Sequence, residues 1–256
     1  MEKIYPIILT LFGILLGIIC FSCVASHKTN IQSPSPAASN GMSSNADAID
    51  YYEKAQKEVK LRNFNEAIKL YTKSLEIDSN FAAAYSSRGG AYLKKERLSE
   101  ALEDQNKPIN IDGNFPRAYF NRGSVRAAKK RFRAAISDYN EANKLDPNYS
   151  RAYAHRGFMY SNIGKQDEAL KDYNKAIELG FEDSVTYYNR GVIYTNRSVG
   201  DHGEQDYLRA TDIDPNNFKA FYNLACLYSR KNDIETTLFY LKKAKNAGFN
   251  ELSFLK

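Results

Sequence analysis

The side chains most able to do chemistry, cysteine and histidine, are few and scattered along this chain of 256 residues. They are Cys20, Cys23, Cys226, His27, His155 and His202. A metal site, or a pair of residues for nucleophilic catalysis, requires such side chains at spacings that let them converge, and these residues lack such spacings. We therefore expect no catalytic residue, no metal and no cofactor.

Composition and charge are those of an ordinary globular protein. Hydrophobic residues make up 43% of the sequence and charged residues 26%, a balance that excludes wholesale disorder. The 36 Lys and Arg residues exceed the 30 Asp and Glu residues by only 6 charges. This small surplus does not predict nucleic-acid binding without a concentrated basic patch. Composition and net charge alone therefore do not indicate a function, and the motifs and repeats along the chain must be considered.

Near the N-terminus, Cys23 stands at the end of an apolar run. The uncharged segment Ile4–Val24 has 21 residues and as a helix could just cross a bilayer core of roughly 30 Å. Ser22 followed by Cys23 resembles the lipobox of bacterial lipoproteins, although Cys20 and Phe21 depart from its usual pattern. The resemblance implies cleavage before Cys23 and acylation of its thiol. An uncleaved membrane anchor and plain secretion are the alternatives.

The segment that follows is unsuited to folding. Residues 24–47 consist largely of Ser, Asn, Ala and Pro, with too little apolar surface to form a core, so we expect a flexible linker. The chain then divides into a signal peptide or membrane anchor over 1–23, this linker, a repeat region over 48–251 and a tail over 252–256.

One period of 34 residues governs the body of the chain. The segments AYSSRGGAY, AYFNRGSVR, AYAHRGFMY, TYYNRGVIY and AFYNLACLY begin at residues 84, 118, 152, 186 and 220, and a diverged copy, DYYEKAQKE, begins at 50. Most copies repeat the arrangement of Tyr153, Gly157 and Tyr160, two aromatic residues with a small residue between them. These positions fall on one helix face, where the small residue lets a second helix approach closely.

The second half of each copy predicts that second helix. It carries a small and an aromatic residue four positions apart, such as Ala169 and Tyr173, and the segments LDPN at Leu145 and IDPN at Ile213 end it. Each helix pair leaves an apolar flank that only a neighbouring pair can cover. Spacing and residue types together resemble the tetratricopeptide repeat (TPR) family. The resemblance implies an all-α solenoid of about six 34-residue helix-turn-helix repeats, with a concave groove for an extended peptide or a partner's helix.

Residues of the first helices that lie opposite the core face are candidates for this groove. Asparagines recur there at one register and can hydrogen-bond a peptide backbone, while tyrosines supply contact area at little entropic cost. The candidate partner-binding residues are Arg117, Phe120, Asn121, Arg151, His155, Tyr188, Asn189, Lys219, Tyr222 and Asn223. The alternative for the asparagines is a solvated polar residue without a binding role. The Lys and Asn pair with which some TPR proteins clamp a terminal carboxylate is absent.

Two repeats depart from the pattern. In the second repeat Gln105 replaces the aromatic residue and Pro108 replaces the alanine, and an interior proline costs a helix roughly 3 kcal/mol. In the fifth repeat Gly203 and Glu204 weaken the start of the second helix. Tolerated drift is the simplest interpretation, and a change in the curvature of the solenoid is the alternative.

A basic segment and an apolar C-terminal segment are two further features of the sequence. The segment KKRFR at Lys129–Arg133 is expected at a turn, where it either meets an acidic partner or lipid headgroups or is simply solvated. The last repeat has no successor to cover its outer flank. Residues 249–256 carry four large apolar residues, Phe249, Leu252, Phe254 and Leu255, and we expect this C-terminal segment to cap the solenoid by packing on the last helix.

The sequence thus predicts a non-enzymatic scaffold that binds a protein partner and is tethered to a bacterial envelope membrane through its N-terminus. Its repeat domain is expected outside the cytoplasm, without a nucleic-acid partner. No nucleophile elbow, phosphate loop or metal spacing favours an enzyme. The main alternative is a structural homo-oligomer of the envelope that pairs through the end of the solenoid.

Overall fold

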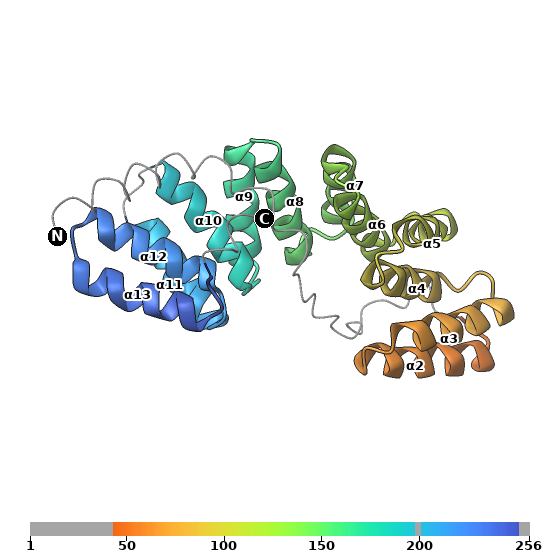
Figure 1. The fold of residues 1–256 in the computed structure, drawn as a ribbon. Coiled ribbons are helices and arrows are strands. Elements are labelled where there is room, and N and C mark those ends of the chain that lie inside the picture. The colour runs from red at the N-terminus through yellow and green to blue at the C-terminus, as the bar shows by residue number, and fades with distance from the viewer. Residues whose placement is uncertain (1–42, 198–200, 251–256) are drawn as a thin grey trace. The chain divides into compact units, whose positions relative to one another are not determined.

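A computed structural model describes residues 43–197 and 201–250, and this part of the chain is helical with no strand. Figure 1 shows the helices arranged as successive pairs. In chain order they are α2 (Ala46–Lys60), α3 (Phe64–Ile77), α4 (Ala82–Lys94), α5 (Leu98–Ile111), α6 (Pro116–Ala128), α7 (Phe132–Leu145), α8 (Ser150–Asn162), α9 (Gln166–Glu178), α10 (Ser184–Asn196), α11 (His202–Ile213), α12 (Phe218–Arg230) and α13 (Ile234–Asn246). The predicted all-α class is confirmed.

Each pair is one repeat, from repeat 1 (α2 and α3) to repeat 6 (α12 and α13). The chain forms two compact units, the first containing α2 to α9 and the second containing α10 to α13. Within each unit the two helices of a repeat pack against each other, and the second helix packs on the first helix of the next repeat. This nearest-neighbour packing is that of a solenoid of helical repeats.

The helices end where the local sequence predicts. α7 ends at Leu145 and α11 ends at Ile213, each directly before an Asp-Pro-Asn segment. Gly180 and Gly248 adopt left-handed φ angles of 78° and 99° after α9 and α13, as glycine does readily at a helix C-terminus. The repeat region begins at Ala46, two residues before the predicted start, because the side chain of Asn45 caps α2.

The turns inside the repeats share one strained residue. Arg62, Glu96, Lys130, Gly164 and Asn232 follow one another at multiples of 34 residues and all have φ between 57° and 78°. A side chain in this left-handed region costs roughly 1–2 kcal/mol. Among these five described positions, glycine relieves that strain at residue 164 alone.

Tyrosines of the second helices form the core. Tyr71, Tyr139, Tyr173 and Tyr207 are each at most 2% exposed. Each of the last three lies against a first-helix glycine, and a Cβ atom on Gly157 would lie only 3.0 Å from the ring of Tyr173. The interpretation of the small and aromatic residues as core is therefore confirmed at these contacts.

In repeat 2, Pro108 does not break its helix. α5 continues through it to Ile111, and the carbonyl of Pro108 accepts a hydrogen bond from the N–H of Asp112 at 2.8 Å. Gln105 is completely buried, and its Nε2 donates to the carbonyl of Ser86 at 2.8 Å. The glutamine thus fills the place of the missing aromatic ring with a polar contact.

In repeat 5, Gly203 is required by packing. A Cβ atom there would collide with the Thr195 hydroxyl, so alanine does not fit at this position. Glu204 accepts hydrogen bonds from the hydroxyl of Tyr228 and the ammonium of Lys231, and so ties α11 to the following repeat. Both departures from the repeat pattern therefore have local packing reasons.

Candidate functional site

Successive first helices lie side by side in the first unit, with α6 in contact with both α4 and α8. We call the surface formed by Arg117 and Asn121 of α6 and Arg151 and His155 of α8 the first-helix face. All four residues are partly exposed to solvent. The structure therefore brings together four of the ten candidate residues on two neighbouring repeats.

Phe120 does not belong to this face. It is only 7% exposed, and its ring centre lies 5.0 Å from that of His155, 5.1 Å from that of Tyr149 and 5.7 Å from that of Tyr139. The prediction that it projects away from the core is wrong. A helical wheel considers one helix pair alone, whereas the next repeat covers this side of α6.

The recurring asparagine register is a seam between repeats. Nδ2 of Asn121 donates to Oγ of Ser86 in the preceding repeat at 2.8 Å, and Asn223 hydrogen-bonds the hydroxyl of Tyr207. His155, at the same register, packs its ring edge-on against Phe120. The side chains of Asn121, Asn223 and His155 therefore contact the neighbouring repeat. We expected either a contact with a partner or exposure to solvent, and neither expectation included these contacts between repeats.

In the second unit, the aromatic candidates also lie against other rings. Tyr188 is half-buried with its ring 5.9 Å from that of Tyr207, and Tyr222 stacks on Phe249 at 5.1 Å. Asn189 and Lys219 are half-buried. Phe249 therefore does fold back, but onto α12, whereas the remainder of the predicted cap, residues 252–256, lies outside the described residues.

The sequence analysis missed an arginine ladder. In repeats 2 to 5 an arginine of the first helix donates hydrogen bonds to both carboxylate oxygens of a buried aspartate, 16 residues later on the second helix, over 2.6–3.2 Å. The pairs are Arg88–Asp104, Arg122–Asp138, Arg156–Asp172 and Arg190–Asp206. The recurring Arg-Gly dipeptide, followed by Asp at constant spacing, is the signal that could have found it.

The ladder also joins one repeat to the next. Nη1 of Arg156 donates to Oδ1 of Asn140 in the preceding repeat at 2.7 Å, and Arg122 makes the equivalent bond to Asn106 at 3.1 Å. The guanidinium of Arg156 lies over the ring of Tyr153 at 5.2 Å. The donor groups of these arginines are therefore engaged in contacts within the fold and are not available to a ligand.

Arg117 and Arg151 differ from the ladder arginines. Neither forms an ion pair or a side-chain hydrogen bond among the described residues. Both act electrostatically on Tyr149, the residue that precedes α8: the two guanidiniums lower the pKa of its hydroxyl, while burial raises it more, to about 12. The first-helix face thus carries two arginines that form no ion pair among the described residues.

Elsewhere, the described residues show no constellation suited to catalysis. No group of three or more His, Cys, Asp or Glu side chains is placed to hold a metal ion in the described ranges. Burial raises the pKa of the Cys226 thiol, which keeps it protonated rather than nucleophilic.

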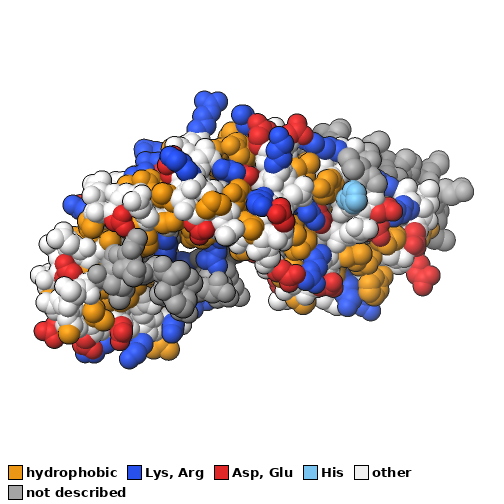
Figure 2. All heavy atoms as spheres, turned by 180° about the vertical axis from the view of Figure 1, so that it is seen from behind, with side chains coloured by type: hydrophobic (Ala, Val, Ile, Leu, Met, Phe, Trp, Pro, Cys, Tyr) orange, Lys and Arg blue, Asp and Glu red, His pale blue; other side chains and the backbone are white. Residues whose placement is uncertain are grey.

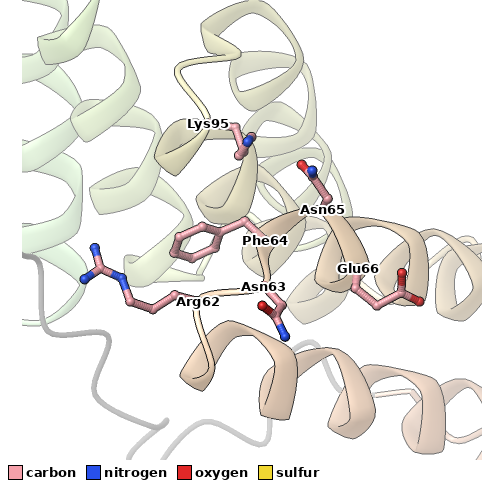
Figure 3. Close-up of a pocket in the computed structure, with 6 residues that line it drawn as sticks. All are labelled: Arg62, Asn63, Phe64, Asn65, Glu66 and Lys95. Carbon is pink, nitrogen blue, oxygen red and sulfur yellow. The ribbon is translucent and has the colours of Figure 1, made fainter.

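A depression of about 370 Å³ lies at the turn between α2 and α3, and Figure 3 shows its residues, Arg62, Asn63, Phe64, Asn65, Glu66 and Lys95. The charged ends of Arg62 and Glu66 point in opposite directions (Figure 3). Because its polar groups do not converge, this depression is not built as a catalytic centre.

Surface charge is mixed over the face drawn in Figure 2, where basic and acidic side chains are interspersed. The Lys129–Arg133 cluster lies at the turn between α6 and α7, as predicted. No helix in the described part of the chain is both long and apolar enough to cross a membrane. The apolar run and Cys23 lie outside the described residues.

Comparison with protein families identifies the repeat. Two family models, both described as tetratricopeptide repeat, match residues 138–171 and 206–239, and residues 51–81 and 116–149. The helix pairs in these residue ranges match tetratricopeptide repeats. A comparison with curated proteins by sequence finds no significant match.

Solved structures share the TPR fold. PilF of Pseudomonas aeruginosa matches with a TM-score of 0.75 at 19% identity, over 82% of this chain and 95% of PilF. YrrB, described as a TPR protein with an unusual peptide-binding site, matches with a TM-score of 0.57 at 23% identity, over 72% of this chain and 95% of YrrB. MamA matches with a TM-score of 0.55 at 24% identity, over 68% of this chain and 94% of MamA. The TPR fold indicates a scaffold for protein–protein interaction.

Proposed function

We propose that this TPR protein binds an extended peptide or a helix of a partner protein on the first-helix face of repeats 3 and 4. The observation that carries this proposal is the contrast between two sets of arginines. Those of the ladder are consumed by the packing of the repeats, whereas Arg117 and Arg151 stand at equivalent places on adjacent helices with no structural partner. Side chains that the fold does not use are available to a ligand. YrrB, a protein of the same fold, is described as having an unusual peptide-binding site, which supports the proposal.

A pull-down from native membranes tests the proposal. The full-length chain is cross-linked in cells, and partner capture is compared with that of the double variant Arg117→Gln/Arg151→Gln. A control, Lys107→Gln/Lys171→Gln, removes the same charge from exposed positions on the second helices α5 and α9. We expect the first variant to lose the captured partner and the control to retain it. Equal capture by all three proteins would contradict the proposal.

The same proposal places the scaffold at a bacterial envelope membrane, with its repeats outside the cytoplasm. Support comes from the sequence alone: the apolar run over residues 4–24, the Ser22–Cys23 pair and the polar linker. If Cys23 carries a lipid, an inhibitor of the lipoprotein signal peptidase should leave a larger precursor, and Cys23→Ala should misprocess or release the protein. A chain of unchanged mass and unchanged membrane retention in both tests indicates an uncleaved anchor.

Pairing through the end of the solenoid is a second candidate function, favoured by the surface of α13. Ile234, Leu238 and Phe239 are 63%, 61% and 52% exposed, an unusual apolar row for a helix surface. Light scattering across a concentration series should show a dimer that Leu238→Glu dissociates. A monomer at every concentration would exclude this function.

A further inference from the structure

We infer that the turns inside repeats 1 to 3 form one continuous basic edge of the first unit, and that this edge docks on a membrane surface rich in anionic phospholipid. We call residues 60–64, 94–98 and 129–133 the basic edge. The inference goes beyond the proposed function, because this edge lies at the turns within the helix pairs and shares no residue with the first-helix face.

The first argument is the sign of the charge at the two kinds of turn. Inside repeats 1 to 3 the turns read KLRNF, KKERL and KKRFR, and in each of them basic residues outnumber acidic ones. The turns between successive repeats, residues 78–81, 112–115 and 146–149, each contain one aspartate and no basic residue. Helices joined by such short turns are antiparallel, so the two kinds of turn lie at opposite helix ends. The first unit therefore has a positive and a negative edge.

Contacts place the turns of the basic edge next to one another. Nζ of Lys129 in repeat 3 lies 3.4 Å from Oγ of Ser99 in repeat 2 and donates to it. Arg62 of repeat 1 and Lys95 of repeat 2 line the same surface depression (Figure 3). Burial lowers the pKa of the Lys94 ammonium, and the nearby positive charge of Arg62 lowers it further. The positive charges of neighbouring repeats therefore act together.

Four cations of this edge are open to a ligand surface. Arg62, Lys95, Arg131 and Arg133 are exposed and form no ion pair with an acidic side chain among the described residues. Arg97, in contrast, is bonded to Glu100 at 2.8 Å. An anionic surface can therefore approach most of the edge without first breaking an ion pair.

Apolar side chains between the basic ones favour a membrane over an acidic protein. Leu61, next to Arg62, is 67% exposed, and Phe64 and Phe132 are half-buried at the same register of repeats 1 and 3. Basic residues mixed with apolar ones are typical of surfaces that lie in the interface of an anionic bilayer, where the apolar groups enter the headgroup region. An acidic protein would require the charges but not the exposed leucine.

The proposed membrane tether supports this inference. Attraction between exposed charges and an anionic leaflet decays over roughly 8 Å at physiological ionic strength. A domain held at the membrane by its own N-terminus meets a high local concentration of headgroups, so a modest affinity is sufficient for docking.

Flotation with lipid vesicles tests the basic edge separately from the N-terminus. The purified full-length chain is held in nanodiscs of neutral phosphatidylcholine, which occupy its apolar segment. It is then mixed with vesicles of phosphatidylcholine alone, or of equal parts phosphatidylcholine and phosphatidylglycerol. We expect wild type to float with the anionic vesicles only, and to be released as the salt concentration rises. The variant Arg62→Gln/Lys95→Gln/Arg131→Gln should bind them at least roughly tenfold more weakly.

A matched control removes the same charge elsewhere. Lys73→Gln/Lys107→Gln/Lys171→Gln changes exposed positions on the second helices α3, α5 and α9 and should bind like wild type. Thermal melting of both variants should match wild type, because the substituted side chains are exposed. The salt dependence of wild-type binding is a second measurement that requires no variant.

The remaining arms distinguish a membrane from an acidic protein. Leu61→Ser should weaken binding to anionic vesicles and leave binding to soluble polyglutamate unchanged. Wild type that binds polyglutamate but no vesicle would assign the edge to an acidic protein and overturn the inference. Equal binding to neutral and anionic vesicles, or equal weakening by the lysine control, would also overturn it. None of these results affects peptide binding on the first-helix face, which the pull-down tests with other residues.

Discussion

Replacing Arg156 by leucine should reveal what the arginine ladder contributes to stability. The substitution removes two bonds to Asp172, at 2.8 and 2.6 Å, and one to Asn140 at 2.7 Å. The Asp172 side chain is only 6% exposed, so its carboxylate is left buried without a counter-charge. Breaking a buried ion pair in this way typically costs roughly 3–5 kcal/mol. Because the Arg156 side chain keeps 18% exposure, we expect the lower end, about 3 kcal/mol.

Repeat 6 of the same chain has apolar and aromatic residues where repeat 4 has the ion pair, and this suggests a second substitution that restores the lost stability. The positions equivalent to Arg156 and Asp172, 68 residues later, hold Leu224 and Tyr240. Leu224 is completely buried there without any ion pair. The double variant Arg156→Leu/Asp172→Tyr places the residue types of repeat 6 at the equivalent positions of repeat 4. It should regain most of the stability that Arg156→Leu loses, because apolar replacements of a buried ion pair are often neutral or stabilising.

The effect of pH has a definite sign. Burial raises the pKa of the Asp172 carboxyl, and its bonds to Arg156 oppose that rise. Without Arg156 the folded-state pKa rises further above the unfolded value, so the native state binds a proton more tightly than the unfolded chain does. The destabilisation by Arg156→Leu should therefore be greatest at neutral pH and decrease as the pH falls through this raised pKa.

Urea denaturation of the purified chain, followed by far-ultraviolet circular dichroism, measures these differences. The control is Lys175→Leu, which breaks the exposed pair Lys175–Glu178 and should cost less than about 1 kcal/mol. The argument is refuted if Arg156→Leu costs no more than this control. It is also refuted if adding Asp172→Tyr recovers nothing.

Three further predictions concern backbone and seam positions. Gly157→Ala should destabilise the chain by roughly 1–3 kcal/mol, because the added Cβ would press on Tyr173. Gly90→Ala lies inside α4 with open space around it and should stabilise the chain by roughly 0.5–1 kcal/mol. Thermal melts of both variants test these two changes. Lys130→Gly should raise the unfolding free energy by up to about 1 kcal/mol by relieving a left-handed side chain, and a drop would show that the turn gains nothing from glycine. Asn121→Ala should cost about 1 kcal/mol through its lost bond to the preceding repeat, and an unchanged urea midpoint would show that the seam contributes nothing there.

The local features of the fold were predictable because each depends on a few residues close together in the sequence. The period of 34 residues, the helix ends at Leu145 and Ile213 and the glycine turns at Gly180 and Gly248 all follow from such short-range rules. The TPR resemblance followed from the same regularity. The contact between Gly157 and Tyr173 was also predictable, because helix periodicity alone places both residues on facing surfaces.

Sequence alone determined the repeat, its helix boundaries and its small-residue contacts, whereas only the tertiary structure decided which candidate side chains remain available to a partner. That outcome depends on how one repeat covers the next. Stacking buries Phe120, uses the amide of Asn121 and leaves Arg117 and Arg151 without a counter-charge. A helical wheel treats these four residues alike, because it contains no information about the neighbouring repeat.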